Sequence, residues 1–334
     1  MALPFFILTL VALFLVGTFL VWLVRRLLGR EAPIRRLAKI AGIGLLVTLP
    51  LFLFLVLPLV ISSLLASAST RPQDRLLTET PGSCGAAFRE ATFQTEDGVT
   101  IRGWYLPGAG DKPTFVMGHG LFRNRIEVLR LACRLNSIGY PSLLFDFRSH
   151  GLSDRDTVTL GYREKLDVLA ACAYALEQQR NKLVLYGISM GAVSCLMAAP
   201  EVEEKLAAVV ADSPFLSLRG TIRRHTWLVL SLPAFPFVDI FLWNFTRLGD
   251  FSETDLDAVR AAAKLREVPV LLIYGGRDRR MPETVAQTFF SEIDSPSKLV
   301  FFPEAGHGQS FRSDSERYIE EVVGFLNNQS MKKE

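Results

Sequence analysis

Lys182-Leu183-Val184-Leu185-Tyr186-Gly187-Ile188-Ser189-Met190-Gly191 is the stretch that decides how this chain folds. The apolar run up to Tyr186 predicts a buried strand, and the small residues that follow Gly191 predict a helix. Ser189 therefore lies on a sharp turn between a strand and a helix. Glycine at both flanks lets the strand and the helix pass closely, and such a turn lifts the serine hydroxyl above the edge of a sheet. Because two glycines around a serine also occur by chance, the motif has meaning only in the right context.

Strand and helix patterns alternate along the chain after residue 85. A hairpin is predicted for 87–106, where Glu96-Asp97-Gly98 is a strong turn signal. Further strands are predicted at 114–117, 142–145, 183–186, 207–211, 270–274 and 298–302, and helices at 125–138, 162–179, 192–199, 282–293 and 315–326. The alternation predicts an α/β fold with a mostly parallel sheet that helices cover on both faces. Ligands bind such sheets at the carboxyl ends of the strands.

Residues 214–265 interrupt this alternation and are rich in apolar and aromatic side chains. We expect them to form an apolar helical cap over the strand ends, which would exclude water and line a pocket for an acyl or alkyl group. A third transmembrane span is the alternative. Pro233, Pro236 and Asp239 interrupt that span, and an odd crossing would separate Ser189 from the C-terminal loops.

A serine hydroxyl becomes a good nucleophile only when a base held in one tautomer removes its proton. The chain has four histidines. We expect His307 to be this base, because it lies in a glycine-flanked loop between the last predicted strand and the closing helix. His119 and His150 each follow an earlier strand and are expected to orient their loops, whereas His225 lies in the cap.

The carboxylate that orients His307 should follow a neighbouring strand. Asp278 follows the next-to-last predicted strand, and the chain order Ser, Asp, His is the one found with this type of turn. Asp212, at the end of the strand before it, is the alternative, and Asp146 comes too early in that order.

The developing oxyanion requires two N–H donors. The turn aims the N–H of Met190 at the oxyanion, and the N–H of Leu121, which follows His119-Gly120, is the expected second donor. No phosphate-binding loop and no metal-ligand spacing occurs in the sequence, so neither a cofactor nor a metal is expected.

Two apolar stretches precede the predicted domain. Residues 3–24 and 40–68 contain no charged side chain, and each exceeds the roughly 20 residues that cross a bilayer as a helix. We expect two transmembrane helices; a cleaved signal is the alternative for the first, although no basic residue precedes it. Loop 25–39 carries six Lys or Arg against one acid, Glu31, and basic loops stay in the cytoplasm. The termini and everything after residue 70 are therefore expected outside the cytoplasm.

The four cysteines show neither metal-ligand spacing nor the density of a disulfide framework. Cys133, Cys172 and Cys195 fall in predicted helices, where we expect buried thiols, and a Cys172–Cys195 bridge stays open as an alternative in an oxidising compartment. The formal net charge of +3 comes largely from loop 25–39, so it gives no case for nucleic-acid binding.

Residues 85–327 resemble the alpha/beta-hydrolase superfamily of serine hydrolases. The matching motifs are, in chain order, His119-Gly120, Asp146-x-Arg-x-His-Gly-x-Ser153, Gly187-x-Ser189-x-Gly191, Asp212-Ser213-Pro214, Asp278 and Gly306-His307. The resemblance implies an eight-stranded, mostly parallel sheet. It also implies Ser189 as nucleophile, His307 as base, Asp278 as its partner, and an oxyanion hole from the amides of Leu121 and Met190.

Two details bear on the branch of this superfamily. Asp212-Ser213-Pro214 and the short cap are similar to the branch that includes membrane-associated acyl-ester and thioester hydrolases and monoacylglycerol-lipase-like enzymes. Leu121-Phe122 departs from the His-Gly-Gly-Gly motif of the hormone-sensitive-lipase-like branch.

We therefore expect a two-helix membrane anchor (1–69), a linker (70–84) and an α/β-hydrolase domain (85–330) with the cap inserted at 214–265. The expected function is a membrane-anchored serine hydrolase that cleaves ester or thioester bonds of lipid-like acyl substrates through an acyl-enzyme. A serine peptidase of the same fold and a non-catalytic, membrane-tethered interaction module are the alternatives. The expected partners are the lipid bilayer and a small acyl substrate, with no nucleic acid.

Overall fold

The computed structural model describes residues 34–74 and 78–330, together with residues 18, 19, 22 and 26. Its centre is an eight-stranded sheet in the order β1-β2-β4-β3-β5-β6-β7-β8. The first two strands run antiparallel to their neighbours, and the remaining strands are parallel. The strands are β1 (Arg89–Gln94), β2 (Thr100–Leu106), β3 (Thr114–Gly118), β4 (Ser142–Phe145), β5 (Leu183–Ile188), β6 (Leu206–Asp212), β7 (Val270–Gly275) and β8 (Ser297–Phe302). This sheet confirms the predicted α/β fold.

Helices cover both faces of the sheet, and each face has its own apolar core. One core lies under α4 (Ile126–Ser137) and α12 (Ser315–Ser330). The other lies under α5 (Glu164–Gln178), α6 (Met190–Ala198) and α10 (Glu283–Ser291). Strands β3 to β7 are buried along almost their whole length, which is why they read as continuous apolar runs.

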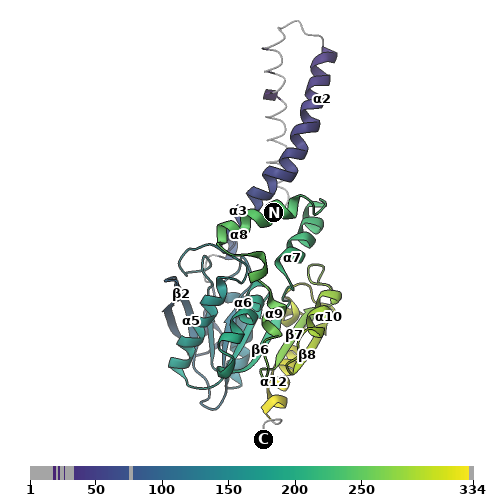
Figure 1. Ribbon diagram of the computed structural model, residues 1–334. Coiled ribbons are helices and arrows are strands. Elements are labelled where there is room, and N and C mark those ends of the chain that lie inside the picture. Colours follow the sequence, from purple (N-terminus) through teal and green to yellow (C-terminus); the bar gives the residue numbers. More distant parts are fainter. Residues whose placement is uncertain (1–17, 20–21, 23–25, 27–33, 75–77, 331–334) are drawn as a thin grey trace.

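A long apolar helix leads into this domain. It comprises α2 (Ile34–Leu51), the π-helical turn η1 (Phe52–Val56) and α3 (Leu57–Ala66), and Figure 1 shows α2 projecting away from the domain while α3 lies against it. Within the described residues, Gly42–Ala66 is the one stretch of helix long and apolar enough to cross a membrane. The expected first span, and most of the basic loop 25–39, lie outside the described residues. The two-span topology therefore stays a prediction.

The cap lies between this helix and the carboxyl ends of the strands (Figure 1). It contains α7 (Leu218–His225), the π-helical turn η6 (Thr226–Leu230), α8 (Phe237–Gly249) and α9 (Ala258–Ala262). Helix α8 packs along α3. The Asn244 side-chain amide also donates hydrogen bonds to the Ser62 and Ser63 hydroxyls at 2.8 and 3.0 Å. The cap is thus attached to the end of the apolar helix.

The described part of segment 70–84 is bonded to the domain. The Thr70 hydroxyl donates to the Arg123 carbonyl at 2.9 Å, and the Arg71 N–H donates to the Phe122 carbonyl at 3.0 Å. A salt bridge of 2.8 Å joins Asp74 to Arg123. Where the sequence suggested only a linker, the chain forms one wall of the candidate site described below.

The cysteine pairing differs from the sequence-based expectation. A disulfide joins Cys84, in the turn Pro81–Cys84, to Cys133 on α4. Cys172 and Cys195 are buried free thiols, and burial raises the pKa of Cys172 to about 12. The expectation of a free thiol at Cys133, and the open alternative of a Cys172–Cys195 bridge, are therefore wrong. No motif or spacing indicates that residues 81–84 fold back onto α4, where the Cα atoms of Cys84 and Cys133 lie 6.3 Å apart.

Candidate active site

Ser189 occupies the turn between β5 and α6 in a strained backbone conformation, with φ 53° and ψ −111°. A Cβ atom added at Gly187 would lie 2.3 Å from the backbone carbonyl of Gly191. One added at Gly191 would lie 2.6 Å from the Gly118 carbonyl oxygen on β3. Neither position tolerates a side chain, so the two glycines are what allows the turn to hold Ser189 above the sheet.

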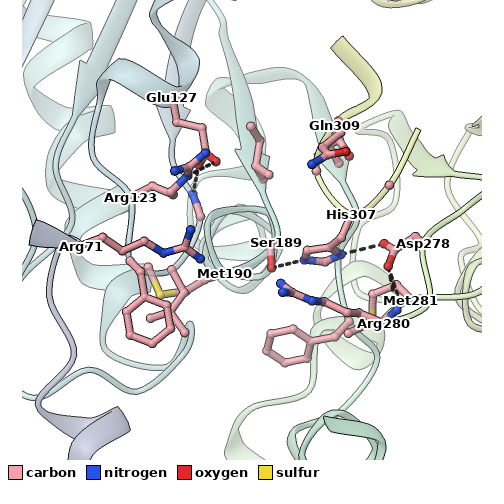
Figure 2. Close-up of a pocket in the computed structure, with 18 of the residues that line it drawn as sticks. Arg71, Arg123, Glu127, Ser189, Met190, Asp278, Arg280, Met281, His307 and Gln309 are labelled. Atoms are coloured by element: carbon pink, nitrogen blue, oxygen red, sulfur yellow. Dashed lines mark hydrogen bonds and ion pairs between the residues drawn. The ribbon is translucent and has the colours of Figure 1, made fainter. Parts of the chain in front are cut away.

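The structure brings Ser189, His307 and Asp278 into one chain of hydrogen bonds (Figure 2). His307 Nε2 lies 2.8 Å from Ser189 Oγ, and His307 Nδ1 lies 2.7 Å from Asp278 Oδ2. Asp278 follows β7 and His307 follows β8, so parallel strands deliver all three side chains to the same edge of the sheet. With the proton on Nδ1 facing the carboxylate, Nε2 presents its lone pair to the hydroxyl.

Asp278 is fixed from its other side. Its Oδ1 atom accepts the backbone N–H groups of Arg280 and Met281 at 2.8 and 3.0 Å. The side chain is fully buried, whereas 14% of the His307 side chain is exposed. The carboxylate is thus immobilised, and the imidazole has access to the pocket.

The two rival carboxylates are used elsewhere. Asp212 accepts the hydroxyl protons of Ser213 and Tyr318 at 2.8 and 3.1 Å, and burial raises its pKa to about 6 against the effect of these two bonds. Asp146 forms a buried ion pair with Arg125 at 2.7 Å. Neither carboxylate has a hydrogen bond to His307.

In the loop after β3, two of three successive backbone amides are hydrogen-bonded within the described residues. The Gly120 N–H donates to Glu127 Oε2 at 2.7 Å, and the Phe122 N–H donates to His150 Nε2 at 3.3 Å. The N–H of Leu121, between them, has no acceptor among the described residues. Met190 is the first residue of α6, where backbone N–H groups have no partner within the helix. These are the two amides expected from the sequence, and both residues line the pocket in front of Ser189.

His119 and His150 hold neighbouring loops together as neutral rings. His119 Nε2 accepts the Phe147 N–H at 3.1 Å while its Nδ1 atom donates to the Gly120 carbonyl at 2.8 Å. His150 Nδ1 donates to the Arg148 carbonyl at 2.8 Å. Burial lowers the pKa of both rings, that of His119 well below its usual range, because a charged imidazole would lose its hydration there.

Glu127 is a site residue that the sequence did not single out. Its Oε2 atom holds the Gly120 N–H, and its Oε1 atom accepts from Arg123 Nε at 2.9 Å. Arg123 in turn bonds Asp74 of the segment that follows the apolar helix. Figure 2 shows Glu127 and Arg123 side by side and bonded to each other. Only the folded loop reveals this role, because Glu127 reads in the sequence as an ordinary acid in the first turn of a helix.

The pocket in front of Ser189 has a volume of about 1140 Å³. The cap contributes apolar side chains to its wall, and the apolar helix contributes Ile61 and Leu65. His225 also lines it, with its ring bonded to the Thr221 carbonyl. Among the described residues, no group of three His, Cys, Asp or Glu side chains is placed to hold a metal ion.

Comparison with known proteins gives a consistent picture. The model of the alpha/beta hydrolase family matches residues 105–323. Among curated proteins, the chain is 25% identical over 235 residues to the uncharacterised protein YqkD of Bacillus subtilis. The aligned residues cover 69% of this chain and 76% of YqkD. The chain is 23% identical over 254 residues to the uncharacterised membrane protein YNL320W of Saccharomyces cerevisiae, covering 74% and 82%.

Solved structures extend the comparison to the fold. The esterase Pf2001 of Pyrococcus furiosus superimposes with a TM-score of 0.65 at 26% identity, over 78% of this chain and 98% of that one. Est1E of Butyrivibrio proteoclasticus, solved with ferulic acid, gives a TM-score of 0.58 at 20% identity, over 72% and 100%, and shows the shared fold.

Proposed function

The chain belongs to the alpha/beta hydrolase family, and on that premise we propose that it is a membrane-anchored serine hydrolase of lipid-like acyl esters or thioesters. The observation that carries the proposal is the bonded series Ser189–His307–Asp278. An esterase with 26% identity and the same fold supports an ester as the scissile bond.

The geometry supports an acyl-enzyme route. Ser189 Oγ attacks the substrate carbonyl carbon while His307 Nε2 takes its proton, and the Asp278 carboxylate stabilises the imidazolium. The N–H groups of Leu121 and Met190 hold the oxyanion. The intermediate collapses, His307 returns the proton to the departing alcohol or thiol, and the acyl group stays on Ser189. Water then attacks the acyl-enzyme by the same steps and releases the acid.

A lipid-like substrate is supported by the surroundings of the pocket. Phe215, Phe237 and Phe241 line it from the cap, next to Ile61 and Leu65 of the apolar helix. The cap also exposes large apolar side chains to the outside, with Trp227, Val229, Phe235 and Trp243 between 57% and 78% exposed. Such a surface beside a helix that can span a bilayer suits contact with lipid.

The proposed side of the membrane is extracytoplasmic. The basic loop 25–39 favours the cytoplasm for itself and hence the opposite side for the domain. The Cys84–Cys133 disulfide supports the same side, because disulfides persist in oxidising compartments. A compartment-sensitive reporter fused to the C-terminus tests this placement, and activity of only a cytoplasmic reporter would overturn it.

The proposed chemistry is tested with the detergent-solubilised full chain. A series of acyl esters, thioesters and peptides of increasing chain length is offered to the wild type and to Ser189→Ala. We expect turnover of esters or thioesters that rises with acyl length and disappears in the variant. Cleavage of peptides alone would point to a peptidase, and inertness toward every substrate would point to a binding module.

A further inference from the structure

The pocket has a strongly basic side that the proposed chemistry does not use. Its lining includes seven arginines, found on the segment after the apolar helix, on the loop after β3, on α4, on the loop that carries Asp278 and on the short helix α11 (Ser310–Ser313). The lining carboxylates do not neutralise all of them. Asp74 and Glu127 are paired with Arg123, and Glu79 is paired with Arg130. The Asp212 carboxylate is hydrogen-bonded to Ser213 and Tyr318, and the Asp278 carboxylate to His307 and two backbone N–H groups.

Two of these arginines face the reaction centre. Figure 2 shows the guanidinium groups of Arg71 and Arg280 pointing from opposite sides toward the space in front of Ser189. Neither side chain forms an ion pair with a carboxylate among the described residues. Arg71 Nε is buried without a hydrogen-bond partner in the described part of the chain. A buried donor without an acceptor destabilises the folded chain, so an anionic acceptor in the pocket is favoured.

Each arginine is attached to a different part of the catalytic constellation. The backbone of Arg71 is bonded to the Phe122 carbonyl, and its guanidinium lies 6.0 Å from the centre of the Phe122 ring, one residue beyond Leu121. The Arg280 N–H donates to the Asp278 carboxylate. The loop that carries Leu121 therefore holds the backbone of Arg71, and Asp278 holds the backbone of Arg280, so both arginines are attached beside Ser189.

We propose that Arg71 and Arg280 bind a phosphate group of the substrate, so that this hydrolase acts on acyl esters whose alcohol carries a phosphate. This inference rests on the proposed function. A phosphate monoester offers up to two charges and three terminal oxygens, which can meet two guanidinium groups from opposite sides. A carboxylate would be satisfied by one of them. The acyl chain lies under the apolar cap, and the alcohol portion lies toward the arginines.

Hydrolysis of such a substrate needs no reactant other than water. Water is consumed, the ester C–O bond breaks, the acyl group leaves as a carboxylic acid, and the phosphate-bearing alcohol leaves with the proton that His307 returns. The phosphate ester bond is untouched.

A matched pair of substrates tests the inference: 1-butanoylglycerol and 1-butanoylglycerol 3-phosphate. Both are soluble as monomers, so a preference reflects the pocket and not the charge of a lipid surface. We expect a higher kcat/KM for the phosphate-bearing ester in the wild type. Arg71→Gln and Arg280→Gln should each lower that kcat/KM about 10- to 100-fold, mostly through KM, because a hydrogen bond to a charged group is lost. The ratio between the two substrates should fall accordingly.

Arg180→Gln is the matched control. Arg180 is exposed and precedes β5, at the end of the sheet opposite the pocket, so this change removes the same charge and should leave the ratio unaltered. Glycerol 3-phosphate should inhibit the wild type competitively and should inhibit Arg280→Gln more weakly. If inorganic phosphate inhibits the wild type as strongly as glycerol 3-phosphate does, the site binds the free ion and the substrate assignment is overturned.

Failure of the phosphate site and failure of the proposed hydrolase function give different results. Equal turnover of both substrates, or a ratio that the two arginine variants leave unchanged, overturns the phosphate site while the hydrolase stands. Absence of turnover for both substrates, with no Ser189 adduct from a fluorophosphonate, overturns the hydrolase and the site together.

Discussion

Replacement of Asp278 by asparagine should lower kcat for ester hydrolysis by about 10³- to 10⁴-fold with the fold intact. The size of this effect follows from how the carboxylate is held. Oδ1 accepts two backbone N–H groups, from Arg280 and Met281, and only an oxygen can keep both bonds. The amide nitrogen of the variant must therefore occupy the Oδ2 position, 2.7 Å from His307 Nδ1.

An N–H donor at that position selects the wrong imidazole tautomer. His307 Nδ1 would have to accept a hydrogen bond, so its proton would move to Nε2 and face Ser189 Oγ. The imidazole could then no longer accept the serine proton. The developing imidazolium would also lose its negative partner, and both losses act on kcat more than on KM.

Asp212→Asn is the matched control, because it makes the same change one strand earlier. The carboxylate of Asp212 accepts from two hydroxyl groups, those of Ser213 and Tyr318, and a hydroxyl can rotate to accept from an amide instead. We expect kcat to change less than about 10-fold. The assay is steady-state hydrolysis of a soluble ester, with thermal melting to show that each variant is folded. A greater loss in Asp212→Asn than in Asp278→Asn would refute the assignment of the acid.

Three further predictions concern the surroundings of the site. Glu127→Ala should lower kcat about 10- to 100-fold with a smaller change in KM, because the loop that carries Leu121 loses the bond that holds Gly120. An unchanged kcat would contradict this positioning role. The buried, neutral His119 should make folding stability fall in acid: the stability that it contributes is present above pH 6.5, the ordinary pKa of histidine, and is lost as the pH falls toward its lowered pKa. The free energy of unfolding, measured in urea at pH 7.5 and 5.5, should fall less with pH in His119→Gln than in the wild type. An equal fall in both proteins would argue against a neutral His119 ring. Cys84→Ser should lower the free energy of unfolding by up to about 4 kcal/mol, because the disulfide closes a separation of 49 residues; equal melting temperatures for the variant and the wild type under non-reducing conditions would exclude the bridge.

The sheet and the position of Ser189 were predictable because they depend on local patterns. Apolar runs such as Leu183–Ile188 have to be buried on both faces, and the glycines around Ser189 serve a turn that no other residue type allows. Chain order then limited the choice of acid and base to a few residues.

What the sequence could not reveal depends on contacts between distant segments. Cys84 pairs with Cys133 of α4, Arg71 bonds Phe122 in the loop after β3, and Glu127 of α4 bonds Gly120 in that same loop. No periodicity or motif encodes these contacts, because the described residues 70–74 and 78–84 contain only two short 3₁₀ turns, Pro72–Asp74 and Pro81–Cys84.

The most direct test of the central claim is the mass of the protein after reaction with a fluorophosphonate. If His307 activates Ser189, the wild type gains one phosphonyl group, peptide mapping places it on Ser189, and Ser189→Ala gains none while its melting temperature stays the same. A phosphonyl group on another residue, or an equal gain in folded Ser189→Ala, would contradict the account.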